Sequence, residues 1–304
     1  MYEVVIIGAG ISGSYLAKIL NEKKIRVLII EKSKSLGGRF STKNVGAGLA
    51  DYGCQYISPK SEVLKNVIQD LLKKKLISEI IFERNKKAFI CPYGLSRIPF
   101  FLSLGVSSVT NQKAYHLIKH KNYWQIKTNL QSFYAKTVVL TSPIKQSKEI
   151  LNKSNISHFR LPEVNYNSFY SITFTTTKKL NDKIFHSEKD YPWICNNNAK
   201  GILNDEIIYT LSVSENKSQE LYKMNNIDQI IRIHSDMENI GFSRIENLEI
   251  HFWKYGFSNN QNNPSHFYDK NLKIGLCGDS FSVGKVDGSI ISANELSKKI
   301  IGNG

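Results

Sequence analysis

The feature that most constrains the fold of this chain is a glycine-rich turn within its first forty residues. A short apolar run, residues 3–7, leads directly into the turn at residues 8–13 (GAGISG), and a stretch with helical apolar spacing follows. A second apolar run, residues 26–30, ends in Glu31. Buried parallel strands are short apolar runs, and a G-x-G-x-x-G turn between strand and helix, followed by an acid, is typical of dinucleotide binding. The order of these segments therefore predicts a Rossmann-type unit.

Each glycine of this turn has a separate physical role. Gly8 permits the tight turn, Gly10 lets the backbone approach a pyrophosphate, and Gly13 lets the helix pack closely on the strand. The N terminus of the helix offers free N–H groups and a positive dipole to phosphates. We expect Glu31 to accept hydrogen bonds from both hydroxyls of a ribose, and its charge argues against a 2′-phosphate on that ribose.

The residues after Glu31 indicate whether the predicted site binds FAD or NAD. Residues 31–42 (EKSKSLGGRFST) resemble the E-x5-GGR-x-(S/T)-(S/T) pattern of the flavoprotein superfamily that includes amine oxidases, protoporphyrinogen oxidases and phytoene desaturases. The paired glycines let the chain pass beside the cofactor, and Arg39 supplies a planar, charged fork for the pyrophosphate. This resemblance implies FAD. We expect the FAD to be bound non-covalently, because no cysteine lies between Cys195 and Cys277 and Cys277 ends a predicted buried strand; a histidine linkage stays open.

A second flavin-contact motif is predicted near the C terminus. Residues 272–277 form a short apolar run that is followed by Gly278-Asp279, and a helix is expected from Asp287 onward. In flavoproteins with two dinucleotide folds, the equivalent Gly-Asp binds the ribityl chain, and the next helix points its N terminus at the pyrimidine end of the flavin. Asp279 taken by itself is also compatible with an ordinary surface loop.

Further segments are similar to the renalase family within this superfamily. They are residues 50–56 (ADYGCQY), similar to A-D-x-G-A-Q-Y; residues 93–96 (YGLS) with Pro99, similar to a G-M-S element; residues 138–143 (VVLTSP) with Gln146; residues 251–255 (HFWKY), similar to H-x-W-(K/R)-(Y/F); and Gly278-Asp279 with residues 286–288 (VDG), similar to GD…V-E-G. Cys54 stands where the family has alanine, and Asp287 where it has glutamate.

The chain order implies an α/β protein in which a Rossmann-type FAD-binding domain is interleaved with an α+β substrate domain built on an antiparallel sheet. The FAD-binding domain is expected to comprise residues 1–58, 96–148 and 268–304, and the substrate domain residues 59–95 and 149–267. Residues 170–174, 207–211 and 248–255 alternate as half-buried strands do. The helical stretch 219–239 is expected to pack on the far side of the sheet.

Two groups of residues follow as candidates for the site. Those expected to contact the cofactor are Gly8, Gly10, Ile11, Ser12, Gly13, Glu31, Lys32, Gly38, Arg39, Asp51, Gly53, Gly278, Asp279, Val286, Asp287 and Gly288. Those expected at the reacting ring are Gln55, Tyr56, Trp193, His251 and Trp253. His251, Trp253 and Tyr255 share one face of a predicted strand, which is either a pocket wall or an ordinary core face. Trp193 and Lys200 resemble a W-x6-K element of the family.

The chemistry is predicted partly from what the sequence lacks. We find no nucleophile motif, no metal-ligand cluster and no clear acid–base pair. Transfer of hydride from a dihydropyridine to flavin N5 needs none of these, because the product ring becomes an aromatic cation and no proton must be removed. The renalase resemblance implies this reaction on isomeric forms of NAD(P)H, with oxygen reoxidising the flavin to give hydrogen peroxide.

Three alternatives stay open at this point. Amine or polyamine oxidation on the same scaffold would suit an acidic tunnel better than a basic chain. A polyene or tetrapyrrole desaturase would need a larger apolar pocket and usually a membrane-facing helix. The third alternative is a protein that binds flavin without turnover.

Composition adds predictions about partners and compartment. The net charge of +15 arises from 41 Lys and Arg against 26 Asp and Glu, and the longest lysine block is residues 73–75. Such a surface either attracts an anionic partner or consists of scattered solvated charges. The four cysteines have no CxxC spacing, which predicts no structural metal and fits a reducing compartment. We expect a cytoplasmic protein with a small-molecule substrate, such as a dinucleotide, and oxygen as partners, and with no nucleic acid, membrane span or signal peptide.

Overall fold

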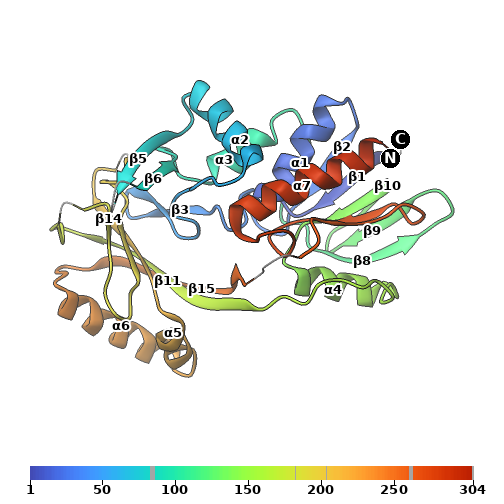
Figure 1. The fold of residues 1–304 in the computed structure, drawn as a ribbon. Helices are drawn as coiled ribbons and strands as arrows, with labels where there is room; N and C mark the ends of the chain where they lie inside the picture. Colours follow the sequence, from blue (N-terminus) through green and yellow to red (C-terminus); the bar gives the residue numbers. More distant parts are fainter. Residues whose placement is uncertain (83–85, 182, 203, 260–262, 303–304) are drawn as a thin grey trace.

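Two β-sheets, one mainly parallel and one antiparallel, form the two halves of the molecule (Figure 1). The computed structural model describes residues 1–82, 86–181, 183–202, 204–259 and 263–302 of the 304-residue chain. The N terminus and the helix α7 near the other end of the chain lie beside the parallel sheet, whereas the long strands β11 and β15 extend from it to the other half. The fold therefore brings distant parts of the sequence to one interface between the halves.

The first sheet is assembled from the start, the middle and the end of the chain. Its strands run in the order β16 (Phe267–Asp269), β17 (Ile274–Leu276), β10 (Ser132–Leu140), β1 (Tyr2–Ile7), β2 (Val27–Ile30) and β7 (Ser107–Val109). β1 is parallel to β10 and β2, and β17 is parallel to β10. The antiparallel strands β8 (Ala114–Lys119) and β9 (Trp124–Thr128) extend β10. The observed strands β2 and β17 are each slightly shorter than the strands predicted from the sequence, which were residues 26–30 and 272–277.

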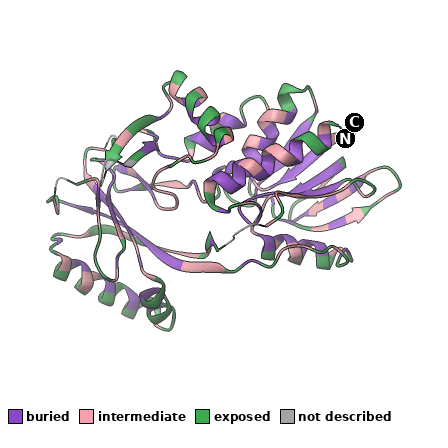
Figure 2. Cartoon of the chain, in the orientation of Figure 1, coloured by how far each residue is buried: buried purple, intermediate pink, exposed green. Residues whose placement is uncertain are grey.

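Alternate residues of β1 supply the apolar cores on the two faces of this sheet. Val4 and Ile6 pack with the helices α1 (Ile11–Glu22) and α7 (Lys285–Ile301), which cover one face. Val5 and Ile7 pack in a second cluster on the other face, where α4 (Ile144–Lys153) lies. Figure 2 shows the sheet and the inner sides of α1 and α7 as buried. Burial on both faces is what parallel strands require.

The second sheet is antiparallel, as predicted. Its strands run in the order β12 (Phe185–His186), β13 (Trp193–Asn196), β14 (Ile207–Ser212), β11 (Tyr166–Thr176) and β15 (Glu246–Ser258). Two helices, α5 (Glu215–Tyr222) and α6 (Asn226–Ile240), cover its outer face and bury an apolar cluster there. The predicted helical stretch 219–239 does pack on the far side of this sheet, but it is divided into two helices, because Asn225 starts a new helix by accepting the N–H groups of Ile227 and Asp228.

Shorter elements connect the two halves. They are β3 (Thr42–Val45), β4 (Gly48–Asp51), α2 (Glu62–Lys73), β5 (Ser78–Phe82), β6 (Lys86–Ile90) and α3 (Arg97–Leu102). The β3–β4 hairpin reaches the second sheet, where the Asn204 side chain pairs with the backbone of Leu49. The predicted α/β class, with a Rossmann-type unit and a separate antiparallel sheet, is confirmed; the residue boundaries of the two domains stay a proposal. None of the helices in the described ranges combines the length and apolar character needed to cross a membrane.

Candidate active site

The glycine turn connects β1 to α1 and leaves room beside the helix N terminus. A Cβ atom on Gly13 would lie 2.1 Å from the carbonyl oxygen of Gly8, so only glycine permits this contact between turn and helix. A Cβ atom on Gly10 would meet no atom within 4 Å. Gly10 is the residue directly before α1, and because glycine has no side chain, the first N–H groups of the helix receive no side-chain cap from this position. These features fit a site for phosphate groups at the start of α1.

Glu31 lies at the end of β2 and points back to this turn. Its carboxylate accepts hydrogen bonds from the N–H groups of Ala9, at 2.9 Å, and Ser33, at 2.8 Å, and the residue is buried. Of the other predicted contacts, Ile11 is buried, Ser12 donates to the carbonyl oxygen of Ser289, and Lys32 is exposed. The Ser12 bond joins α1 to α7, so the two end motifs meet.

Arg39 and Asp279 form a bidentate ion pair across the site. Both guanidinium–carboxylate distances are 2.6 Å, although the residues are 240 positions apart. Arg39 also donates to the carbonyl oxygen of Gly256 at 3.3 Å. Burial tends to lower the pKa of Arg39, but the Asp279 carboxylate outweighs it, and the net shift is upward. The guanidinium fork predicted for a pyrophosphate is therefore charged, held in place and adjacent to the predicted ribityl-binding acid.

The loop after β17 is fixed by the C-terminal helix. The Gly278 N–H donates to Ser292 of α7 at 3.1 Å, and a Cβ atom on Gly288 would lie 3.0 Å from the carbonyl oxygen of Phe281. The Asp287 carboxylate accepts the N–H and the hydroxyl of Ser61, and Val286 packs against the apolar cluster of α2. Asp287 thus links the start of α7 to the start of α2, and its predicted contact with a cofactor stays a prediction.

Asp51 forms a fully buried ion pair with Lys200. The Nζ–Oδ2 distance is 2.6 Å, and both side chains are 0% exposed. The carboxylate also accepts the Thr42 hydroxyl at 2.6 Å and the Leu95 N–H at 2.8 Å. Asp51, predicted to contact a cofactor, is therefore already held by three protein donors. They come from β3, from the segment before α3 and from the β13–β14 connection of the second sheet.

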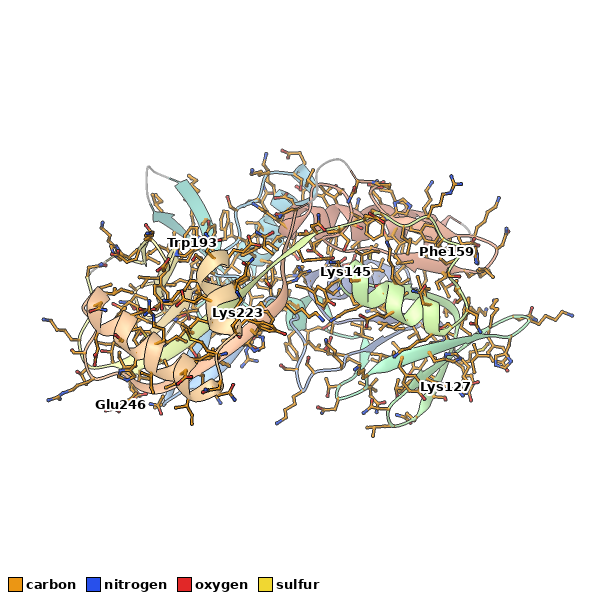
Figure 3. All side chains as sticks on the ribbon, turned by 90° about the horizontal axis from the view of Figure 1, so that it is seen from below. Lys127, Lys145, Phe159, Trp193, Lys223 and Glu246 are labelled. Atoms are coloured by element: carbon orange, nitrogen blue, oxygen red, sulfur yellow. The ribbon has the colours of Figure 1, made fainter. Side chains whose placement is uncertain are left out.

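Gln55 and Tyr56 follow this pair and face the second sheet. The Gln55 amide donates to the carbonyl oxygen of Asp51 at 2.8 Å and accepts from Lys200 at 3.4 Å. The Tyr56 ring lies 5.6 Å from Trp193 and 5.5 Å from Phe185, so these three rings form one aromatic cluster. Figure 3 places Trp193 in the half of the molecule that contains the antiparallel sheet. The structure therefore brings Gln55, Tyr56 and Trp193 together.

His251 and Trp253 surround Tyr52 from strand β15. Their rings lie 5.0 Å and 5.4 Å from the Tyr52 ring, and the Trp253 indole N–H donates to the Tyr52 carbonyl oxygen at 2.9 Å. Burial, and then the nearby Lys43, lower the pKa of His251, which favours the neutral form of its imidazole. Tyr255 contacts Tyr166. Gly53 lies between these groups, because a Cβ atom there would be 2.2 Å from the Arg39 carbonyl oxygen and 3.3 Å from Trp253.

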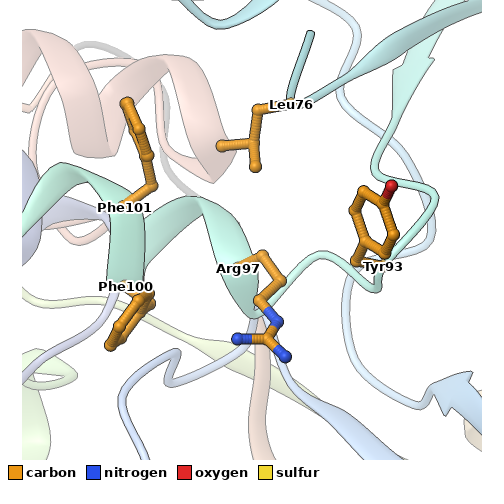
Figure 4. Close-up of a pocket in the computed structure, with 5 residues that line it drawn as sticks. All are labelled: Leu76, Tyr93, Arg97, Phe100 and Phe101. Carbon is orange, nitrogen blue, oxygen red and sulfur yellow. The ribbon is translucent and has the colours of Figure 1, made fainter. Parts of the chain in front are cut away.

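The segment at residues 93–96 contributes through its backbone. The Leu95 N–H binds Asp51, and the Ser96 N–H donates to the Thr42 hydroxyl at 3.1 Å. The Tyr93 side chain is exposed and borders a separate surface pocket of about 310 Å³ at α3 (Figure 4). Its other lining residues are Leu76, Arg97, Phe100 and Phe101. This pocket shares no lining residue with the site described above.

Three carboxylates at the site are each neutralised by a basic side chain. Asp279 pairs with Arg39 at 2.6 Å, Asp51 with Lys200 at 2.6 Å, and Glu249 of β15 with Lys43 at 2.8 Å. Glu31 and Asp287 are instead satisfied by N–H groups. Among the site residues that the structure describes, every acid therefore has a donor of its own.

The cysteines near the site are expected to react slowly with thiol reagents. Burial raises the pKa of Cys54 and Cys195 to about 11 and that of Cys277 to about 12, so the thiolate is scarce at pH 8. We expect an aromatic disulfide reagent at pH 8 to modify the native protein at least about 100-fold more slowly than the same protein in denaturant. Rapid titration of even one thiol in the native protein would contradict this expectation.

Several residues of the network have no strong signal in the sequence. Thr42, Asn197 and Thr210 all bind Asp51, and they come from different elements. In the sequence, a role of Lys200 at the site is indicated only by the W-x6-K resemblance. None of these positions could be connected to Asp51 without knowing which strands pair.

Comparisons with known proteins agree with this architecture. Residues 6–71 match the model of a family described as an NAD(P)-binding Rossmann-like domain. A flavin-containing amine oxidase A of Sus scrofa is 38% identical over 72 residues, which are 23% of this chain and 14% of that protein. A solved structure assigned as a protoporphyrinogen oxidase of Exiguobacterium superposes with a TM-score of 0.74 at 10% identity, over 98% of both chains. A triple mutant of a putrescine oxidase gives a TM-score of 0.72 at 10% identity, over 100% of this chain and 99% of that one.

These similarities define the class of fold. The chain carries a Rossmann-like dinucleotide-binding domain, and its whole length has the fold of amine oxidases and protoporphyrinogen oxidases. The local match covers only 14% of the amine oxidase. A shared fold supports many chemistries, so the substrate must be argued from the site.

Proposed function

We propose that this protein is an FAD-dependent oxidoreductase. The proposal is supported by the space at Gly10, the N terminus of α1 and the adjacent Arg39–Asp279 pair. The glycine turn would hold the pyrophosphate, Glu31 the ribose of the adenosine, and the segment from Gly278 to the start of α7 the flavin end. Of the remaining predicted contacts, Ile11, Ser12, Lys32, Gly38, Val286, Asp287 and Gly288 lie in or near these segments along the chain. Gly53 packs against the Arg39 carbonyl oxygen, and Asp51 lies in the buried pair with Lys200.

The observation that carries the choice of substrate is the neutralisation of the site's acids. A cationic amine binds best where an unpaired carboxylate offsets its charge, but Asp51, Asp279 and Glu249 are already paired with basic side chains. The site therefore favours a donor that is neutral at its reacting ring and gives up hydride directly.

Isomeric dihydronicotinamides are donors of this kind, and we propose them as the substrates, as in renalases. When bound, FAD would accept the hydride at N5, and oxygen would then take up the two electrons to form hydrogen peroxide. The rings of Tyr56, Trp193, His251 and Trp253 would hold a planar donor between the halves of the molecule. Aromatic faces also stabilise the positive charge that appears on the donor ring as hydride leaves. Gln55 would contribute its amide to the position of the ring.

Amine oxidation and polyene desaturation would each require different features of the site. Amine oxidation is supported by the likeness to amine and putrescine oxidases, but that likeness shows the fold alone. A desaturase acting on a polyene would need a long apolar channel. A protein that binds flavin without turnover would show no reduction by any donor.

Anaerobic stopped-flow mixing tests the proposal directly. The protein purified with FAD is mixed with the isomeric dihydronicotinamides, and benzylamine, putrescine and ordinary NADH serve as comparison donors. We expect the flavin band near about 450 nm to bleach within milliseconds to seconds with the isomers, because hydride transfer between held rings needs no proton transfer. We expect the amines to be slower by about 100-fold or more.

The results separate the alternatives. Bleaching by an amine in preference to the isomers would replace the proposed substrate but keep a flavin oxidoreductase. An absence of bleaching with every donor would favour a binding role. A protein that purifies colourless and cannot take up FAD would end the whole proposal.

A further inference from the structure

A row of paired residues crosses the second sheet beneath the Asp51 network. Trp193 of β13 pairs with Ser212 of β14, Ser212 pairs with Ser171 of β11, and Ser171 pairs with His251 of β15. Residues that pair directly across antiparallel strands point to the same face of the sheet. The row therefore has an aromatic ring at each end and two small hydroxyl side chains in the middle.

This face of the sheet is turned toward the dinucleotide-binding half. His251 at one end of the row contacts the Tyr52 ring, and Trp193 at the other end contacts Tyr56. In the next row, Thr210 pairs with Thr173 of β11, and the Thr210 hydroxyl donates to the carbonyl oxygen of Asp51 at 2.8 Å. Ser171 and Thr173 are two residues apart on one strand, so both face the interface between the halves.

The hydroxyls of Ser171 and Thr173 are buried without a partner. Ser171 is 1% exposed and Thr173 is 0% exposed, and among the described residues neither hydroxyl has a hydrogen-bond partner. Thr210, which pairs with Thr173, does have one. Buried polar groups are nearly always satisfied, so two adjacent exceptions at a candidate active site call for a ligand or an ordered water.

The row is not equally buried along its length. Ser212, Trp193 and His251 are half-buried, whereas Ser171 is closed off from solvent. Strands in a sheet lie about 4.8 Å apart, so the two aromatic ends of the row are about three strand spacings apart, with only the small side chains of Ser212 and Ser171 between them. A ring that enters over Ser212 would bring a substituent on its edge to Ser171 and Thr173.

We infer that Ser171 and Thr173 recognise the carboxamide of a pyridine substrate. A hydroxyl group both donates and accepts, and a primary carboxamide offers one acceptor and two donors, so two adjacent hydroxyls match it on both sides. An ammonium group would leave both hydroxyl protons without an acceptor. This inference rests on the proposed function for its substrate class and assigns the group on the ring by which the substrate is selected.

Binding measurements on the holoprotein test the inference without requiring turnover. The probes are nicotinamide mononucleotide and its analogue without the carboxamide, and the readout is the perturbation of the flavin absorption band during titration. We expect the wild-type protein to bind the carboxamide compound about tenfold or more tightly than the analogue. In the double variant S171A/T173V, both compounds should bind with similar affinity. T173S, which keeps the hydroxyl, should retain the preference.

The outcomes are distinct from those of the reduction experiment. No preference in the wild-type protein, or a preference that survives in S171A/T173V, would overturn the inference. The ratio of flavin to protein absorbance checks that the variant holds its cofactor, and S171A alone replaces the double variant if that ratio falls. Preferential binding together with no flavin reduction would refute the proposed function and leave the recognition of the carboxamide intact.

Discussion

Replacing Asp51 with asparagine is expected to lower the free energy of unfolding by about 3–5 kcal/mol, because the change leaves the Lys200 ammonium buried and without its counter-charge. Both partners are 0% exposed, so water cannot solvate the remaining charge. Lys200→Met should cost a similar amount, since Asp51 would then keep only the Thr42 and Leu95 donors. Urea unfolding curves measure both effects, and a change in the midpoint at constant slope identifies a loss of stability.

An exposed pair and the double variant serve as controls. Lys74→Met breaks the surface pair with Asp70 and should cost less than about 1 kcal/mol. The double variant D51N/K200M removes both charges, and we expect it to be more stable than the sum of the single effects predicts. If D51N unfolds at the same urea concentration as the wild-type protein, the pair does not hold the two halves together.

The second large effect is expected at the glycine turn, where two alanine substitutions should act differently. Gly10→Ala should leave the stability of the cofactor-free protein within about 0.5 kcal/mol, because its Cβ would meet no protein atom within 4 Å. The same Cβ would project into the space proposed for the pyrophosphate. We therefore expect FAD affinity to fall by about 100-fold or more, measured by fluorescence titration of cofactor-free protein.

Gly13→Ala should impair both properties. Its Cβ would lie 2.1 Å from the Gly8 carbonyl oxygen, so α1 must move away from the turn. We expect lower stability in urea as well as weaker FAD binding. Equal FAD affinity in G10A and wild-type protein would show that the cofactor does not pass over Gly10.

The parts of the fold that depend on local sequence could be predicted from the sequence. The β1–turn–α1–β2 unit is set by an apolar strand, three glycines and a helical spacing within about thirty residues, and each of these has a direct physical cause. The antiparallel second sheet follows from alternating strands. The break between α5 and α6 could not be placed from apolar spacing, because it depends on the capping side chain of Asn225.

The residues of the site could be predicted where a local backbone motif determines their position. The ion pairs between residues far apart in the sequence could not be predicted. Arg39 and Asp279 were each expected at the cofactor, but nothing local indicates that they pair. Asp51 was expected to contact the cofactor, although its carboxylate is held by protein donors. Its partner Lys200 lies in the β13–β14 connection of the other half of the molecule. The unpartnered hydroxyls of Ser171 and Thr173 become visible only when strand register and burial are known.

The strand order of the first sheet also has a consequence for biosynthesis. β17 adds to β10 only when residues 274–276 have left the ribosome, and α7 follows it. β10 ends at residue 140 and β17 at residue 276, so at about 5–20 residues per second about 7–27 s pass between them, and during that time the edge of β10 at residues 138–140 has no partner. An open strand edge is a template for wrong pairing between nascent chains. The yield of folded protein therefore depends on how rapidly β17 and α7 dock, a property that the stability of the folded molecule does not report.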